Sequence, residues 1–183
     1  WWQRTVWLVG GVVGTLCLQG QAAEAPGSAA AAFARGERIC LIGNSLADRM
    51  QHDGWLESLL QSAQVGQELV IRNLGYSGDQ VANRPRISGS PTLEDYLALT
   101  KADTILCFFG YNESFAGTAG LARFKTDYTA LVRKLQAGQY NGKTPPRLVL
   151  FSPIAFENRR DPLLPDGVEH NARLAAYSQA IAE

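Results

Sequence analysis

The segment that sets the architecture is Ile39-Cys40-Leu41-Ile42-Gly43-Asn44-Ser45-Leu46. An uninterrupted apolar run that ends at a glycine is typical of a short strand buried on both faces of a parallel sheet. In open α/β sheets, ligands bind at the carboxyl ends of the strands. The segment therefore predicts a buried strand that delivers Ser45 to the ligand-binding edge of a sheet.

The rest of the chain repeats this alternation of strand and helix. Three further apolar runs predict strands at 68–74, 104–109 and 148–151. Apolar residues at helical spacing predict helices at 55–60, 91–100, 121–135 and 171–183, with Gly138 as a C-terminal stop and a polar loop over 155–168. The pattern predicts an α/β fold with a parallel sheet and helices on both faces. Such a fold normally adds a further strand and helix, so we expect the domain to be truncated at its C-terminus.

Composition narrows the classes of function. Among 183 residues, Lys and Arg number 17 and Asp and Glu also number 17, so no excess positive charge favours nucleic acid as a partner. The chain has only two histidines and three scattered cysteines, which do not form a metal-binding motif. We therefore expect no metal and no cofactor.

The amino terminus resembles an export signal. Arg4 precedes an apolar stretch over 5–20, and small residues follow, so 1–23 is predicted to be a signal peptide. An uncleaved membrane anchor is the alternative, although the stretch is short and Gly-rich for a spanning helix. Leu16 before Cys17 argues against a lipoprotein site. We expect an Ala-rich linker at 24–36, a folded domain at 37–183, a secreted or periplasmic location, and no stable membrane insertion after cleavage.

Three polar or glycine residues follow the ends of three different predicted strands. Ser45 can expose its hydroxyl beside backbone N–H groups at a helix start, or it can simply cap that helix. Gly78 can offer a backbone N–H to a ligand, or it can be a plain turn glycine. Asn112 can donate its side-chain amide to an oxyanion, or it can stabilise an Asx turn. Three such residues in this order favour a single site for acyl transfer.

These segments carry a resemblance to the SGNH (GDSL-type) hydrolase family. Gly43-Asn44-Ser45-Leu46 resembles the first block of the family, 73–79 the second and Gly110-Tyr111-Asn112-Glu113 the third. Asn44 and Glu113 each replace the Asp that is usual there, at positions that are not catalytic in the family. The resemblance covers 37–183 and implies a flavodoxin-like three-layer α/β/α fold.

The resemblance also implies a role for each candidate. Ser45 corresponds to the nucleophile, Gly78 to a backbone donor of the oxyanion hole, and Asn112 to its side-chain donor. The fourth block of the family, Asp-x-x-His, has no match here, because Asp166 and His170 are four residues apart rather than three. His52 follows the nucleophile segment too closely and is interpreted as a residue at a helix start or pocket rim. We expect the catalytic base to lie beyond Glu183.

Two cysteines test the strand order that the resemblance implies. That order makes the first and third strands neighbours. Cys40 is five residues before Ser45 and Cys107 is five before Asn112, so they are predicted to lie level in adjacent strands. We expect buried thiols, although a disulfide is the alternative in an exported protein.

The leading hypothesis is a serine esterase that hydrolyses carboxylic esters of small molecules or carbohydrates, with deacetylation as one reaction. The alternative is a non-catalytic ligand-binding module that keeps the cleft of the family without a working base. A nucleotide-binding domain is disfavoured, because neither Gly-x-Gly-x-x-Gly nor a P-loop follows the first strand. The oligomeric state stays undetermined.

Overall fold

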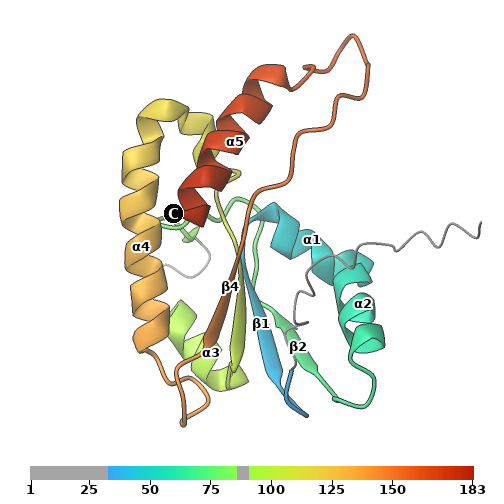
Figure 1. The fold of residues 1–183 in the computed structure, drawn as a ribbon, viewed down its shortest axis with the longest axis vertical. Coiled ribbons are helices and arrows are strands. Elements are labelled where there is room, and N and C mark those ends of the chain that lie inside the picture. Colours follow the sequence, from blue (N-terminus) through green and yellow to red (C-terminus); the bar gives the residue numbers. More distant parts are fainter. Residues whose placement is uncertain (1–32, 86–90) are drawn as a thin grey trace, which may run out of the picture. The chain divides into compact units, whose positions relative to one another are not determined.

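The computed structural model describes residues 33–85 and 91–183 of this chain (Figure 1). Its elements follow in the order β1 (Arg38–Gly43), α1 (Ser45–Asp53), α2 (Trp55–Ala63), β2 (Val70–Asn73), α3 (Leu93–Thr100), β3 (Thr104–Phe108), η2 (Glu113–Ala116), η3 (Thr118–Gly120), α4 (Leu121–Ala137), β4 (Arg147–Phe151) and α5 (Val168–Ala182).

The four strands form one parallel sheet in the order β2-β1-β3-β4. The predicted parallel sheet is confirmed, and so is the neighbouring position of the first and third strands. β1 and β3 lie at the centre, and all five residues of β3 are buried, as are all but Arg38 of β1. Because the strands are parallel, their carboxyl ends reach the same edge, and the segments after β1, β2 and β3 lie there.

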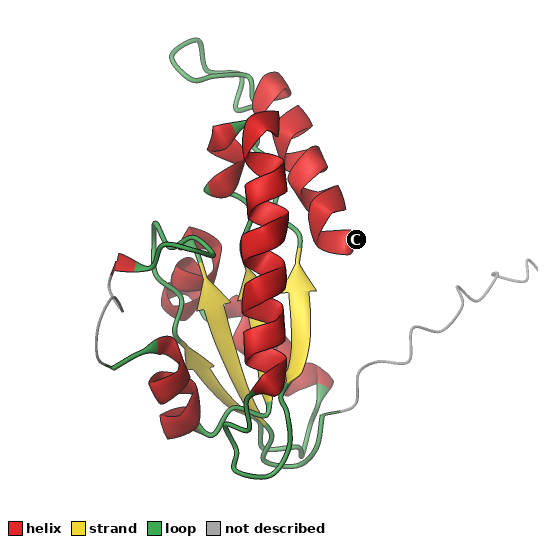
Figure 2. Cartoon of the chain, turned by 90° about the vertical axis from the view of Figure 1, so that its left-hand side faces the viewer, coloured by secondary structure: helices red, strands yellow, loops and turns green. Residues whose placement is uncertain are grey.

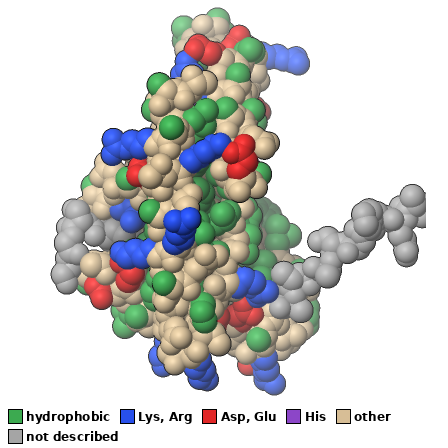
Figure 3. Space-filling model, turned by 60° about the vertical axis from the view of Figure 1, so that its left-hand side comes forward, with side chains coloured by type: hydrophobic (Ala, Val, Ile, Leu, Met, Phe, Trp, Pro, Cys, Tyr) green, Lys and Arg blue, Asp and Glu red, His purple; other side chains and the backbone are tan. Residues whose placement is uncertain are grey.

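Helices cover both faces of the sheet, as predicted. One apolar cluster joins alternate residues of β1 and β3 to α3, α4 and α5, and α4 lies in front of the sheet in Figure 2. The opposite residues of the same strands pack against α1 and α2. This alternation follows from the two-residue period of a strand, and it gives the three-layer α/β/α arrangement. In Figure 3, basic and acidic side chains are interspersed on one face.

Element boundaries differ from the predicted ones by a few residues. β2 begins only at Val70, since Glu68 has a positive φ of 52° that removes it from the strand. α5 begins at Val168 rather than at Asn171, directly after Gly167 with φ 78°. The side chain of Asn171 instead accepts from the Phe156 N–H at 2.7 Å and donates to the Phe156 carbonyl at 3.0 Å. The two 3₁₀ turns before α4 were not predicted.

The cysteine prediction is half right. Cys40 and Cys107 are both buried free thiols on the same face of neighbouring strands. They are not level, because Cys107 pairs with Ile42 and Cys40 pairs with Ile105. The error has a simple cause: Ser45 lies two residues past the end of β1, whereas Asn112 lies four residues past the end of β3. Counting back from the two loops therefore misjudges the register by two residues.

The predicted signal peptide at 1–23 and most of the linker at 24–36 lie outside the described residues. In the part of the chain that the structure describes, no helix has both the length and the apolar character that spanning a bilayer requires.

Gly43 provides a sharp test of the fold. Its φ is +130°, and a Cβ atom there would overlap the backbone carbonyl of Phe108 on β3. We expect Gly43→Ala to lower the free energy of unfolding by at least about 3 kcal/mol, measured by urea denaturation. Gly142→Ala is the matched control, because its φ is +74° but no atom lies within 4 Å of the added Cβ. It should cost about 1 kcal/mol; equal losses in the two variants would contradict the close packing at Gly43.

The two thiols provide a second test. Burial raises the pKa of the Cys40 thiol, and it raises that of Cys107 to about 12. Both should therefore resist a thiol reagent at pH 8 in the folded protein and react after unreduced protein is unfolded in denaturant. In a Cys17→Ser variant, which leaves only these two cysteines, Ellman titration of the unfolded protein should find two thiols; finding none would indicate a disulfide.

Candidate active site

Ser45 lies where β1 passes into α1. Asn44 is the N-cap of that helix, and its side-chain oxygen accepts from the Leu46 N–H at 3.1 Å. The cap is therefore Asn44 and not Ser45. Ser45 is exposed, and its hydroxyl makes no hydrogen bond within residues 33–85 and 91–183. This leaves an unengaged hydroxyl at the positive end of a helix.

Gly78 lies in a tight turn after β2. The Asp79 N–H donates to the Tyr76 carbonyl at 3.0 Å, and Gly78 has φ +93°, which a side chain rarely adopts. Gly78 is exposed, and no atom lies within 4 Å of where its Cβ would be. Gly78 is therefore a turn glycine, and its backbone is also exposed enough to meet a ligand.

This turn is held against α1 by two contacts. Ser77 donates its hydroxyl to the Asp48 carboxylate at 2.5 Å. Gly75 packs so closely on α1 that a Cβ there would lie 2.5 Å from the Ala47 Cβ. The second segment is therefore fixed to the same helix that begins with Ser45.

Asn112 connects the third segment to the second. Its side-chain Nδ2 donates to the Asp79 carbonyl at 3.0 Å, so Asn112 lies beside the residue that follows Gly78. It makes no side-chain cap for the short helix after it. One of the two N–H bonds of the amide is used in this contact, and the other is left for a further acceptor.

Glu113 also links the third segment to the second. The sequence analysis did not identify this role. One carboxylate oxygen accepts from the Val81 N–H at 2.8 Å, and the other accepts from the Gly110 N–H at 2.9 Å. Asp48 was missed in the same way. Each is an acid within three residues of a candidate site residue, which is the signal that could have drawn attention to both.

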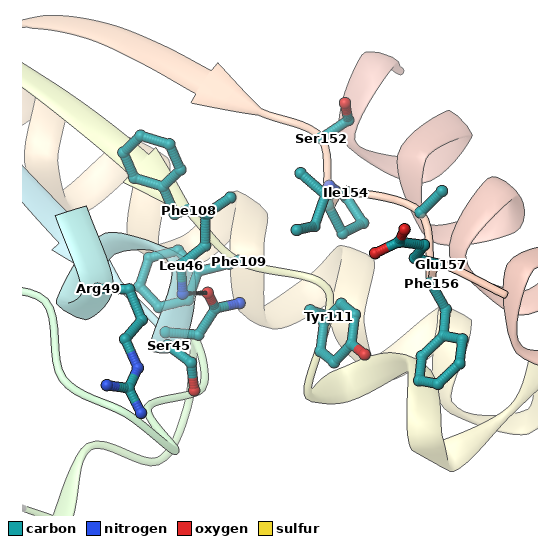
Figure 4. A pocket seen from close by; sticks show the side chains of 13 residues that line it. Ser45, Leu46, Arg49, Phe108, Phe109, Tyr111, Ser152, Ile154, Phe156 and Glu157 are labelled. Atoms are coloured by element: carbon teal, nitrogen blue, oxygen red, sulfur yellow. Dashed lines mark hydrogen bonds between the residues drawn. The ribbon is translucent and has the colours of Figure 1, made fainter. Parts of the chain in front are cut away.

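Ser45 opens onto a cleft of about 420 Å³ at the carboxyl edge of β1, β3 and β4 (Figure 4). Its walls are largely apolar and include Leu46, Phe108, Tyr111, Ile154 and Phe156. Asn112 instead lines a second cavity of about 490 Å³, which is bordered by more polar residues that include Gln80, Asn83, Arg123 and Asp127. The structure thus joins Asn112 to the turn that contains Gly78 through the Asp79 carbonyl, and it holds that turn against α1, which begins at Ser45. The cavities at Ser45 and at Asn112 differ in character.

Neither histidine is among the residues that line the cleft at Ser45. His52 was interpreted as a residue at a helix start or at a pocket rim; it lies instead in the last turn of α1, two turns from Ser45, and does not line the cleft. The ring of His170 stacks on Phe115 at 4.5 Å and meets Tyr111 edge-on at 5.2 Å. Its Nε2 is buried and has no hydrogen-bond partner among the described residues. His170 is therefore a packing residue of the α5 contact.

Within the described residues, no three His, Cys, Asp or Glu side chains gather as a metal site would require. Two acids near the candidate site, Asp48 and Glu113, are engaged with donors of the protein instead.

No protein-family model and no curated protein matches this sequence. The structure, however, is similar to that of an acetyl xylan esterase variant from Geobacillus stearothermophilus, with TM-score 0.59 and 15% identity. It is also similar to an alpha/beta hydrolase from the metagenome of Lake Arreo, Spain, with TM-score 0.53 and 17% identity. Each similarity covers 82% of this chain and 72% of the other.

The chain has the fold of these hydrolases. The fold expected from the SGNH resemblance, a three-layer α/β/α arrangement on a parallel sheet, is thereby confirmed.

The contact between Ser77 and Asp48 is testable by pH. The hydrogen bond from Ser77 lowers the pKa of the Asp48 carboxyl. We expect Ser77→Ala to raise that pKa, as read by NMR titration, while the pKa of Asp95, which is lowered by Thr92, stays unchanged. Because the folded-state pKa of Asp48 is depressed, the stability that this bond contributes is present above the ordinary carboxyl pKa and is lost as the pH falls. An unmoved Asp48 pKa in Ser77→Ala would show that the contact does not form.

Proposed function

We propose that this chain carries the nucleophile and the oxyanion hole of a serine esterase. The observation that supports it most is the exposed, unengaged hydroxyl of Ser45 at a helix N-terminus, beside a cleft of about 420 Å³. The volume suits a small-molecule ligand. Esterases and hydrolases among the structures of similar fold add support for ester hydrolysis.

The chemistry is a two-step acyl transfer. The Ser45 oxygen attacks the ester carbonyl carbon while a base takes its proton, and the carbonyl π electrons move onto oxygen. The oxyanion accepts from the backbone N–H groups of Ser45 and Gly78 and from the free N–H of the Asn112 amide. Collapse expels the alcohol, which takes the proton back from the base. Water then repeats the sequence and releases the carboxylic acid.

The contact between Asn112 and the Asp79 carbonyl suits this role. A donor contributes most when it is already oriented before charge develops, and one such donor is worth about 3–4 kcal/mol of barrier. The 3.0 Å bond to Asp79 holds the Asn112 amide in one orientation at no cost during the reaction.

The side from which a base can reach Ser45 follows from the packing. The second segment is fixed against α1 through Ser77 and Gly75, on the side of β2. The cleft opens on the other side, toward β4. A general base for Ser45 must therefore act from the cleft, and neither described histidine does so.

The alternative is a binding module without turnover. The packed ring of His170 and the distant placement of His52 favour it, because a serine hydroxyl without a base is a weak nucleophile. In that case the cleft binds an ester or a similar ligand and releases it unchanged.

Acetylated carbohydrate is the substrate we favour for the enzyme. The polar cavity beside Asn112 suits a hydroxyl-rich alcohol portion, and the similar fold of an acetyl xylan esterase agrees with it. Carbohydrate esters outside the cytosol fit the proposed secreted or periplasmic location. We propose no nucleic acid partner and no cofactor.

Hydrolysis of p-nitrophenyl acetate tests the proposal. We expect slow turnover by the 1–183 chain that Ser45→Ala abolishes and Asn112→Ala reduces about 100-fold. Ser62→Ala on α2, another exposed serine, is the matched control and should leave the rate unchanged. Turnover that survives Ser45→Ala would refute the assignment of the nucleophile.

Free imidazole tests whether only a base is missing. Added imidazole should enter the cleft and raise the Ser45-dependent rate, after subtraction of the rate measured with Ser45→Ala. If imidazole has no such effect and no acyl-enzyme is detected by mass spectrometry, the binding module is the better description.

A further inference from the structure

We infer that Arg49 is a specificity-determining residue that selects esters carrying a negatively charged group near the scissile carbonyl. The inference rests on the proposed function, in which Ser45 is the reacting residue, and it names the class of substrate.

Arg49 follows Ser45 by one helical turn. Residues four apart on a helix lie on the same face, with Cβ atoms about 5–6 Å apart. Both residues line the cleft, and in Figure 4 the Ser45 hydroxyl and the Arg49 guanidinium extend to the same side of α1. A ligand positioned at Ser45 is therefore within reach of the guanidinium.

The guanidinium has no partner of its own. Within residues 33–85 and 91–183, Arg49 forms neither an ion pair nor a hydrogen bond. The neighbouring acid, Asp48, is occupied by Ser77 and by the Gln51 amide at 2.6 Å. Six other cations of the described chain are in ion pairs, namely Arg35, Arg123, Lys125, Lys134, Arg147 and Arg173.

The two walls of the cleft carry opposite charges. The N-terminus of α1 and Arg49 make the Ser45 wall positive. Glu157 is the one acid among the described residues that line this cleft, and Figure 4 shows it on the opposite wall. The apolar residues between these walls suit a short carbon chain. The matching ligand is an ester in which a carboxylate or phosphate lies a few bonds from the ester carbonyl.

The negative charge can belong to the acid or to the alcohol portion of the ester, and two probe pairs distinguish these sources. Monoethyl succinate and ethyl levulinate have similar shape and differ in a carboxylate on the acyl side. The methyl glycosides of acetylated galacturonate and acetylated galactose differ in a carboxylate on the alcohol side. Binding to the 1–183 chain with Ser45→Ala is measured by NMR titration, so that no turnover is needed.

We expect the charged member of one pair to bind about three- to fivefold more tightly at low salt, as an exposed ion pair allows, and the advantage to fade in 0.5 M NaCl. Arg49→Gln should remove the advantage. Arg133→Gln, which removes an exposed charge from α4, should preserve it. Thermal unfolding checks that both variants remain folded.

An equal affinity within both pairs, an advantage that survives Arg49→Gln, or no binding of any probe would overturn the inference.

This test can fail independently of the esterase proposal. A charge preference in binding without Ser45-dependent hydrolysis would sink the esterase and leave the role of Arg49 intact. Hydrolysis without charge preference would do the reverse.

Discussion

The close approach of β1 to β3 at Gly43 is the constraint on which the site depends. The backbone of Gly43 lies against the Phe108 carbonyl where a side chain would overlap it, and the Asn44 N–H donates to that same carbonyl at 3.0 Å. The chain can then turn at once into α1 with Asn44 as its cap. A larger residue at 43 would force the strands apart and move the start of the helix, and with it Ser45.

The loops around the site are held by side-chain hydrogen bonds to backbone groups and to one hydroxyl, with Asp48 and Glu113 as acceptors and Asn112 as a donor. Asp48 binds Ser77, Glu113 binds the N–H groups of Val81 and Gly110, and Asn112 binds the Asp79 carbonyl. Polar loops at a sheet edge lack the regular ladder that orders a strand, so their backbone groups need such partners. Asp48 and Glu113 are therefore engaged in holding the loops, and Glu157 is the one acid among the described residues that line the cleft.

The fold could be predicted from the sequence because its strands and helices each carry a local hydrophobic pattern. The continuous apolar runs of β1 and β3 reflect burial on both faces, and the helix stripe at Phe124, Tyr128, Leu131 and Leu135 is buried as expected. The register of Cys107 was missed because it depends on how many residues separate each strand end from its loop, and no sequence pattern states that number. The early start of α5 was missed because it depends on Gly167 and on the contact of Asn171 with Phe156, two features of tertiary packing.

The sequence indicated candidate residues, but it did not indicate the contacts that link their segments. Ser45, Gly78 and Asn112 were singled out because each follows an apolar run. Asp48 and Glu113 bond to partners far along the chain, and Arg49 is marked only by the cleft that it lines. This difference bears on function. In the proposed site, backbone N–H groups and the Asn112 amide would face the developing negative charge, and Asp48 and Glu113 are engaged with donors of the protein. On the proposed function, such a site would stabilise an anionic reaction centre before any substrate arrives, and it would further require a base that reaches the Ser45 hydroxyl from the cleft.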